Sequence, residues 1–107
     1  MSETSQVTKP IVDALNQMGH FAMRLNAGKV RIGRRYLQLL PAGTADILCF
    51  TRQGTVLWLE TKKAGNHTNR EQIEAQGAFK SKVEAFGHTY ARVASLDDAL
   101  TALHLRP

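Results

Sequence analysis

The chain has 107 residues, 43% of them hydrophobic and 21% charged, which predicts one folded domain over residues 1–107 and excludes a disordered chain. A single cysteine, Cys49, excludes an internal disulfide framework and a multi-cysteine zinc site. No stretch contains the ~20 apolar residues of a membrane span, and the polar N-terminal segment has no apolar signal run, so we expect a cytoplasmic protein. The 14 lysines and arginines against 9 acidic residues give a net charge of +5, which weakly favours a polyanionic partner.

The first predicted element is an amphipathic helix, because apolar residues recur at helical spacing. They are Val7, Ile11, Ala14, Leu15 and Met18. Pro10 fits the first turn of such a helix, where its missing N–H costs nothing, and Gly19 fits its end. We therefore expect the helix to begin near Ser5 or Thr8.

The remaining elements alternate between strands and helices. In chain order we predict strands over residues 21–25, 36–39, 44–50 and 55–62, a helix from Thr68 to Phe86, a strand over 88–93 and a short helix capped by Ser95. The first two strands are expected to pair with each other, and the next two to form a hairpin. The order α-β-β-β-β-α-β-α suits an α/β fold, a mixed β-sheet flanked by helices.

The turn between the first two predicted strands is strongly basic. No acidic residue lies between Asp13 and Asp46, and the turn carries four cations, Lys29, Arg31, Arg34 and Arg35. We interpret it as a phosphate-binding surface of a nucleic-acid-binding protein. The alternative is a solvated loop that contributes only to solubility.

Two carboxylates and a lysine are predicted to meet at the end of the second hairpin. Alternation puts Glu60 and Lys62 on one side of their strand, and the hairpin places Asp46 at about the level of Glu60. An aspartate in an apolar run needs a cation or a hydrogen-bond network. Mg²⁺ takes one or two carboxylates together with water and phosphate. The alternative to a metal site is an ion pair at a strand end.

Gln72 is expected on the core-facing stripe of the long helix. It precedes Ala75, Phe79 and Phe86 at helical spacing, in the first turn. Taken alone, such a glutamine is more often a hydrogen-bonded structural residue than a catalytic one. Its place directly after the strand of Glu60 and Lys62 favours a role at the same site.

These residues resemble, in their order, the motifs of the PD-(D/E)XK nuclease superfamily. The motifs are Gly43-Thr44-Ala45-Asp46, Glu60-Thr61-Lys62 and Gln72, and over residues 7–103 the chain is similar to the VRR-NUC family, as a standalone phage-type module. The resemblance implies that Asp46 and Glu60 bind Mg²⁺ or Mn²⁺, with the main-chain carbonyl of Thr61 as a third ligand. It also implies that Lys62 orients or activates the attacking water and that Gln72 orients ligands or substrate.

The resemblance further implies a metal-dependent endonuclease that acts as a homodimer on structured or branched DNA, such as four-way junctions, with a bacterial or phage origin. The family has a glutamate on its first helix at the position of Thr4, whereas this chain has Glu3 one step away. Glu3 is then a displaced ligand, or the role is absent or passes to another group. The number of metal ions bound, one or two, therefore stays open. No P-loop is present, so no nucleotide cofactor is expected. The alternatives are a nucleic-acid-binding module of the same fold with weak or lost catalysis, and a basic scaffold domain.

Overall fold

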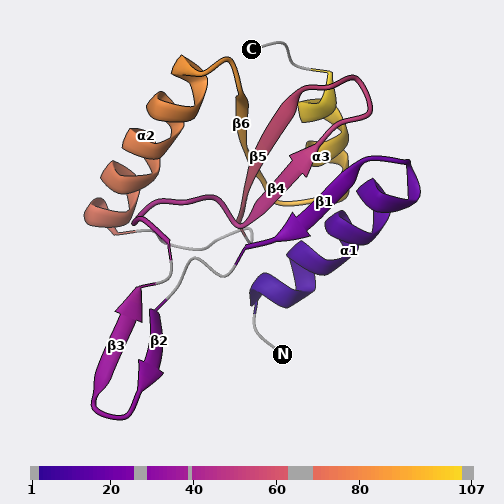
Figure 1. Cartoon of the computed structure of the whole chain (residues 1–107). Coiled ribbons are helices and arrows are strands. Elements are labelled where there is room, and N and C mark those ends of the chain that lie inside the picture. Colours follow the sequence, from indigo (N-terminus) through magenta and orange to yellow (C-terminus); the bar gives the residue numbers. More distant parts are fainter. Residues whose placement is uncertain (1–2, 26–28, 39, 63–68, 105–107) are drawn as a thin grey trace.

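The computed structural model describes residues 3–25, 29–38, 40–62 and 69–104, without the side chains of residues 3–6, 29, 30 and 38. Its elements are α1 (Glu3–Gln17), β1 (Phe21–Arg24), β2 (Lys29–Ile32), β3 (Arg35–Gln38), β4 (Ile47–Phe50), β5 (Val56–Thr61), α2 (Arg70–Ala85), β6 (Thr89–Val93) and α3 (Leu96–Leu103). Four strands form a mixed sheet in the order β1-β4-β5-β6, and β2 and β3 form a separate sheet (Figure 1). The predicted α/β class with a mixed sheet is confirmed, and β2 is a strand that the predicted order lacks.

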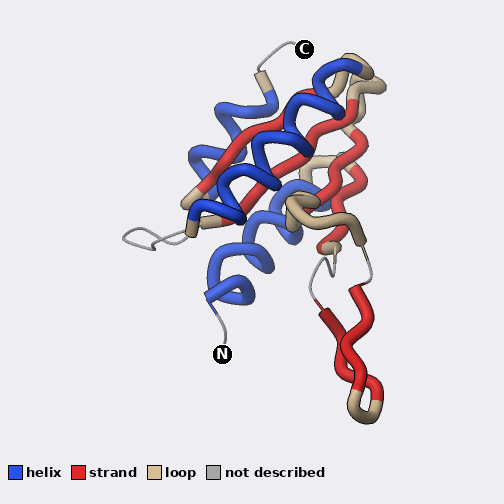
Figure 2. The backbone as a smooth tube through the Cα atoms, turned by 90° about the vertical axis from the view of Figure 1, so that its left-hand side faces the viewer, coloured by secondary structure: helices blue, strands red, loops and turns tan. Residues whose placement is uncertain are grey.

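Helices cover both faces of the four-stranded sheet (Figure 2). On one face α1 and α3 pack against Leu57 and Leu59 of β5, which are buried together with Val93 of β6. On the other face Phe79 and Val83 of α2 pack near Trp58. Because neighbouring residues of a strand point to opposite faces, β5 contributes to both cores, and Glu60 lies on the α2 side with Trp58.

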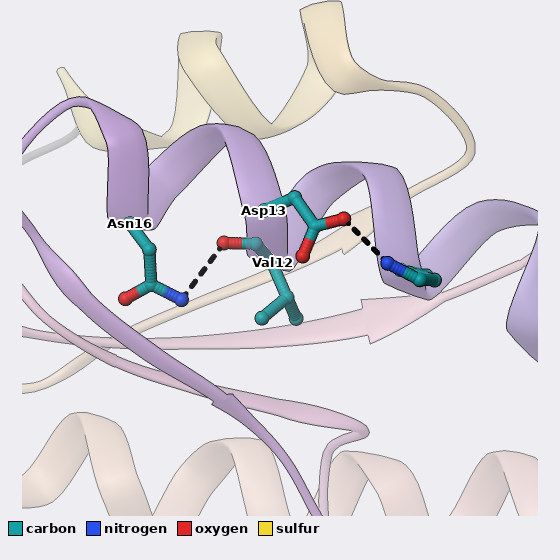
Figure 3. Close-up of polar contacts among 4 residues, drawn as sticks. Val12, Asp13 and Asn16 are labelled. Atoms are coloured by element: carbon teal, nitrogen blue, oxygen red, sulfur yellow. Dashed lines mark hydrogen bonds and ion pairs between the residues drawn. The ribbon is translucent and has the colours of Figure 1, made fainter.

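The C-terminal end of α1 is fastened to β1 by one side chain, Asn16. Its Nδ2 donates to the carbonyls of Val12 and Ala22, 3.0 Å each, and its Oδ1 accepts from the Ala22 N–H at 3.0 Å. Figure 3 shows the bond to Val12 beside the exposed ion pair of Asp13. The amide therefore fixes where the first strand leaves the helix.

The start of α1 differs from the prediction. The helix begins at Glu3, so Pro10 lies in its interior and not in its first turn. Pro10 is exposed, so water can take the place of the backbone hydrogen bond that it removes. The apolar stripe also differs at two places: Met18 is exposed beyond the helix, and Thr8 is fully buried.

The predicted pairing of the first two strands is wrong. β1 pairs antiparallel with β4, with Arg24 opposite Ile47, and β3 pairs with β2. The hairpin of β2 and β3 closes on a two-residue turn, Gly33-Arg34, in which Gly33 has a φ of 62°. A positive φ at the first turn position is typical of the tight hairpins that form between neighbours in the chain. The predicted hairpin of residues 44–50 and 55–62 is confirmed as β4 and β5.

The residues that cap α2 and α3 can be compared with the predicted starts of these helices. Ser95 caps α3 as predicted, by accepting from the Asp98 N–H. The N-cap of α2 is Asn69 and not Thr68, which lies outside the described residues, because the Asn69 carboxamide accepts from the Gln72 N–H at 2.8 Å. Phe86 is exposed at the end of α2 and not part of its buried stripe. No helix in the described part of the chain is long and apolar enough to cross a membrane.

Gly43 allows the loop before β4 to touch the backbone of α2. Its φ is 85°, and a Cβ at this position would overlap the carbonyl of Ala75 and approach the Gln76 nitrogen. No other residue can make this approach without moving helix or loop. Gly43 therefore sets the distance between α2 and the loop that carries Asp46.

We predict that Gly43→Ala is much more destabilising than Gly54→Ala, its matched control. Gly54 has a similar φ, 88°, but nothing within 4 Å of its would-be Cβ, so Gly54→Ala adds backbone strain of about 1 kcal/mol. Gly43→Ala adds steric overlap and is expected to cost about 3 kcal/mol or more of the free energy of unfolding. Urea denaturation of both variants measures the difference, and equal losses would show that the loop does not press against α2.

Candidate active site

Three strands of the main sheet meet at one end, where the predicted site residues lie. Because β1 is antiparallel to β4 and β4 to β5, the end of β1, the start of β4 and the end of β5 lie together (Figure 1). The register that pairs Ile47 with Leu59 sets Asp46 opposite Glu60. The predicted meeting of the two carboxylates therefore follows from the hairpin register.

Asp46 is held in place by Thr61. The Thr61 N–H and its hydroxyl both donate to Oδ2 of Asp46, at 2.9 and 2.8 Å. The Thr61 Oγ1 also lies 3.1 Å from the Thr8 Oγ1, and since the Thr61 proton is used on Asp46, Thr8 is the donor of this bond. The buried Thr8 thereby connects α1 to the site, and the main chain of Thr61, the predicted third ligand, lies beside Asp46.

Glu60 is almost completely buried, with 7% of its surface exposed. Burial raises its pKa to about 9, and the hydrogen bond and the negative charge of Asp46 add to the rise, while Arg92 on β6 opposes it. At neutral pH Glu60 therefore keeps a proton, which it shares with Asp46. A cation between the two carboxylates can take the place of that proton.

Lys62 extends β5 by one residue toward the same site. Its N–H donates to the Val93 carbonyl at 2.8 Å, so the parallel ladder with β6 continues past Thr61. Alternation then puts Lys62 on the face of Glu60, where it is half-buried. It forms no ion pair with any side chain that the structure describes.

The predicted placement of Gln72, on the core-facing stripe of the helix, is wrong. Gln72 is exposed in the first turn of α2, and only its N–H is engaged, by the Asn69 cap. The glutamine that turns inward is Gln76, one turn later, which is partly buried and packs beside Gly43. Helical spacing assigns both glutamines to one face, but it cannot tell which turn of the helix has the sheet beneath it.

Two buried polar atoms, one on α2 and one on β6, lack a hydrogen-bond partner among the described residues. They are Oε1 of Gln76 and the hydroxyl of Tyr90. Tyr90 lies opposite Trp58 in the parallel β5–β6 pair, and burial together with the charge of Glu60 raises its pKa to about 12. Buried polar atoms in folded proteins are nearly always satisfied, so these two atoms are candidates for contact with a ligand. Sequence spacing gave no signal for Tyr90.

The donor set fits a divalent cation such as Mg²⁺ or Mn²⁺. Such a cation accepts two carboxylates and a carbonyl and completes its coordination with water and phosphate. No group of three or more His, Cys, Asp or Glu side chains gathers within the described ranges. Glu3 is the first residue of α1, and its side chain lies outside the described part.

The predicted basic turn is a hairpin that stands away from the rest of the molecule (Figures 1 and 2). Arg31, Arg34 and Arg35 are all exposed on it, whereas the side chain of Lys29 lies outside the described part. The hairpin is inserted between β1 and β4, so it leaves the sheet at the end where Asp46 lies. The cations and carboxylates are therefore at the same end of the protein.

The fold is that of a known domain. Neither protein-family models nor curated proteins match the sequence. A solved structure described as "VRR_NUC domain" is similar to this chain with a TM-score of 0.61, over 96% of each chain and with 15% sequence identity. At this identity the similarity establishes the fold, and it confirms the expected PD-(D/E)XK arrangement of a mixed sheet flanked by helices.

The buried proton on Glu60 predicts a pH dependence of stability. The folded-state pKa of about 9 lies above the ordinary value of 4.5, so the folded form binds the proton more tightly than the unfolded chain does. The resulting stabilisation is complete below pH 4.5 and is lost as the pH rises toward 9. In chelator, the melting temperature of the wild type should therefore fall between pH 5 and 9.

Glu60→Gln should flatten this fall and be more stable than the wild type at pH 8, because the amide cannot ionise. Glu84→Gln, at an exposed position of α2, is the control and should keep the wild-type slope. Thermal melts of the wild type and both variants across this pH range measure the slope of melting temperature against pH. A wild-type slope in Glu60→Gln would mean that Glu60 is ionised in the folded protein.

Proposed function

We propose that this protein is a metal-dependent nuclease of the VRR-NUC family that hydrolyses phosphodiester bonds in DNA. The observation that carries the proposal is the pairing of Asp46 with the buried Glu60 at a sheet end that also carries Lys62. Two acidic groups placed together in a largely buried position cost stability, and a site for a cation would explain why they are there. The fold similarity to a VRR_NUC domain supports the same reason, a site for a cation and a phosphate.

Asp46, Glu60 and the Thr61 carbonyl would hold Mg²⁺ or Mn²⁺. Such a metal, when bound, supplies Lewis acidity and lowers the pKa of a coordinated water. Thr61 keeps the Asp46 carboxylate oriented through two hydrogen bonds, and Glu60 would act as a ligand in its ionised form. Lys62 would orient the attacking water and stabilise negative charge that develops on the phosphate.

DNA is the proposed substrate because the β2–β3 hairpin, which leaves the sheet at the end where Asp46 lies, is cationic. No acidic residue lies between Asp13 and Asp46, so a phosphate can approach Arg34 and Arg35 without displacing a carboxylate. Each phosphate contact on duplex DNA releases counterions and steepens the salt dependence of binding by about 0.9 log units. The resemblance to standalone VRR-NUC modules favours endonuclease cleavage of structured or branched DNA, and a homodimer as the working form.

We predict that Asp46→Asn and Lys62→Met abolish cleavage of labelled duplex, flap and four-way-junction DNA while the protein stays folded. Asparagine keeps the shape and an acceptor for Thr61, and methionine keeps the apolar stem of lysine. Mn²⁺ should support cleavage, and chelator should stop it. Lys9→Met, at an exposed position of α1, is the matched control and should cleave at the wild-type rate.

Metal binding is measured separately from cleavage. Millimolar Mn²⁺ should raise the melting temperature of the wild type by mass action and leave that of Asp46→Asn unchanged. Cleavage by both variants at the wild-type rate would refute the site. Tight DNA binding by the wild type without cleavage, and without a thermal shift, would establish the alternative, a DNA-binding module of this fold that has lost catalysis.

The two glutamines of α2 give a further prediction. We propose that the buried Gln76 amide, whose Oε1 has no partner among the described residues, hydrogen-bonds water or substrate in the site, so Gln76→Ala should lower the cleavage rate by about tenfold or more. Gln72→Ala changes an exposed side chain and should leave the rate unchanged. Single-turnover cleavage by both variants measures the effect. The reverse order would restore Gln72 as the functional residue.

A further inference from the structure

The β2–β3 hairpin carries apolar side chains that none of the other described helices and strands covers. Ile32, Tyr36 and Leu37 are 60%, 67% and 50% exposed, and the hairpin contacts none of the other described helices and strands. An isolated two-stranded hairpin is marginally stable in water, and apolar side chains exposed on it add to the cost of leaving it free. The exposed apolar side chains therefore indicate that the β2–β3 hairpin, called the arm below, binds a partner that covers them.

Each face of the hairpin combines an apolar and a cationic residue. Arg31 lies opposite Tyr36, and Ile32 lies opposite Arg35. Since side chains alternate along a strand, Leu37 shares the face of Ile32 and Arg35, and Tyr36 shares the other face with Arg31. Packing one face on another protein would leave the other with an uncovered apolar residue and an uncompensated charge. The arrangement suits a partner that contacts both faces.

The charge of the arm selects the kind of partner. The arm carries arginines and no acidic residue, and Arg34 sits at the tip of its turn. The Arg31 Nε donates to the Gly33 carbonyl at 3.0 Å and stiffens the turn, whereas Arg34 and Arg35 have no ion-pair partner among the described side chains. A nucleic acid offers both phosphates for the arginines and flat base surfaces for the apolar residues.

We propose that the β2–β3 hairpin inserts into DNA at a branch point or gap, where Tyr36 on one face and Ile32 and Leu37 on the other contact base surfaces that an intact duplex keeps stacked. Apolar side chains that enter a base step unstack it, and this costs least where stacking is already interrupted. The hairpin thereby selects interrupted DNA and delivers it to the end of the sheet that holds Asp46. This inference rests on the proposed function, because it assigns to the hairpin the recognition of the DNA that the same site would cleave.

The test measures binding without cleavage. The Asp46→Asn protein is titrated in chelator against a four-way junction, a gapped duplex and an intact duplex of equal length, with 2-aminopurine next to the branch or gap. The protein should bind interrupted DNA more tightly than duplex and brighten the 2-aminopurine as the base unstacks. Adding Tyr36→Ala should weaken binding to interrupted DNA by about tenfold or more, the loss typical of one stacked base, and suppress the brightening. Its binding to intact duplex should barely change.

Two control variants separate stacking from other effects. Arg34→Ala should weaken binding to all three DNAs alike and flatten the salt dependence, because it removes a phosphate contact. Phe86→Ala removes an even more exposed aromatic residue at the C-terminal end of α2, remote from the hairpin (Figure 1), and should change nothing.

The outcomes distinguish this inference from the proposed function. Equal losses on duplex and interrupted DNA in Tyr36→Ala, or no loss, would overturn the insertion and leave the nuclease proposal intact. Selective binding by a protein that does not cleave with Mn²⁺ would overturn the nuclease and leave the insertion intact. Sedimentation showing that Tyr36→Ala converts a dimer into a monomer would assign the arm to a second copy of the chain and overturn the insertion.

Discussion

The Asp46 carboxylate accepts two hydrogen bonds from Thr61 while it lies beside the buried Glu60, and much of the fold serves this contact. Two carboxylates in a largely buried place repel each other unless a proton or a cation lies between them. Burial and the neighbouring Asp46 raise the pKa of Glu60 to about 9, which favours its protonated form at neutral pH. A divalent cation held by both carboxylates, as proposed above, would relieve the same repulsion.

The meeting of these carboxylates depends on contacts made by several helices and strands. The β4–β5 register sets them opposite each other, Thr8 of α1 holds Thr61 from the opposite face of the sheet, and Gly43 lets α2 close over the loop. Each contact is local, but together they connect two strands, two helices and one loop at a single point. A shift of one residue in the register would turn Glu60 toward the α1 face.

The basic hairpin has a different relation to the fold. It contributes nothing to the two cores, and the apolar side chains that it exposes to water lower stability. Its place in the chain, between β1 and β4, sets it at the end of the sheet that holds the carboxylates. A segment that the core does not need, yet that leaves the sheet at the site, is best explained by what it contacts outside the protein. The core and the hairpin thus divide the proposed work between catalysis and substrate recognition.

Much of this protein was determined by its sequence, because local physics decides the features concerned. Alternation and the tight turn between residues 50 and 56 sufficed to bring Asp46 to Glu60, and Ser95 and Gly19 marked helix ends where short-range hydrogen bonds and backbone freedom act. The tertiary structure alone decided the pairing of β1 with β4 and the separate hairpin, since the same short strands can pair in more than one way. It also decided that Gln76 and not Gln72 is partly buried, because helical period assigns a face but not the position along the axis at which the sheet begins. Pro10 is a further case, because its preference for a first turn placed the predicted helix start too late. The buried contacts of Thr8 and Ile11 stabilise a helix that begins before Pro10 and continues past it.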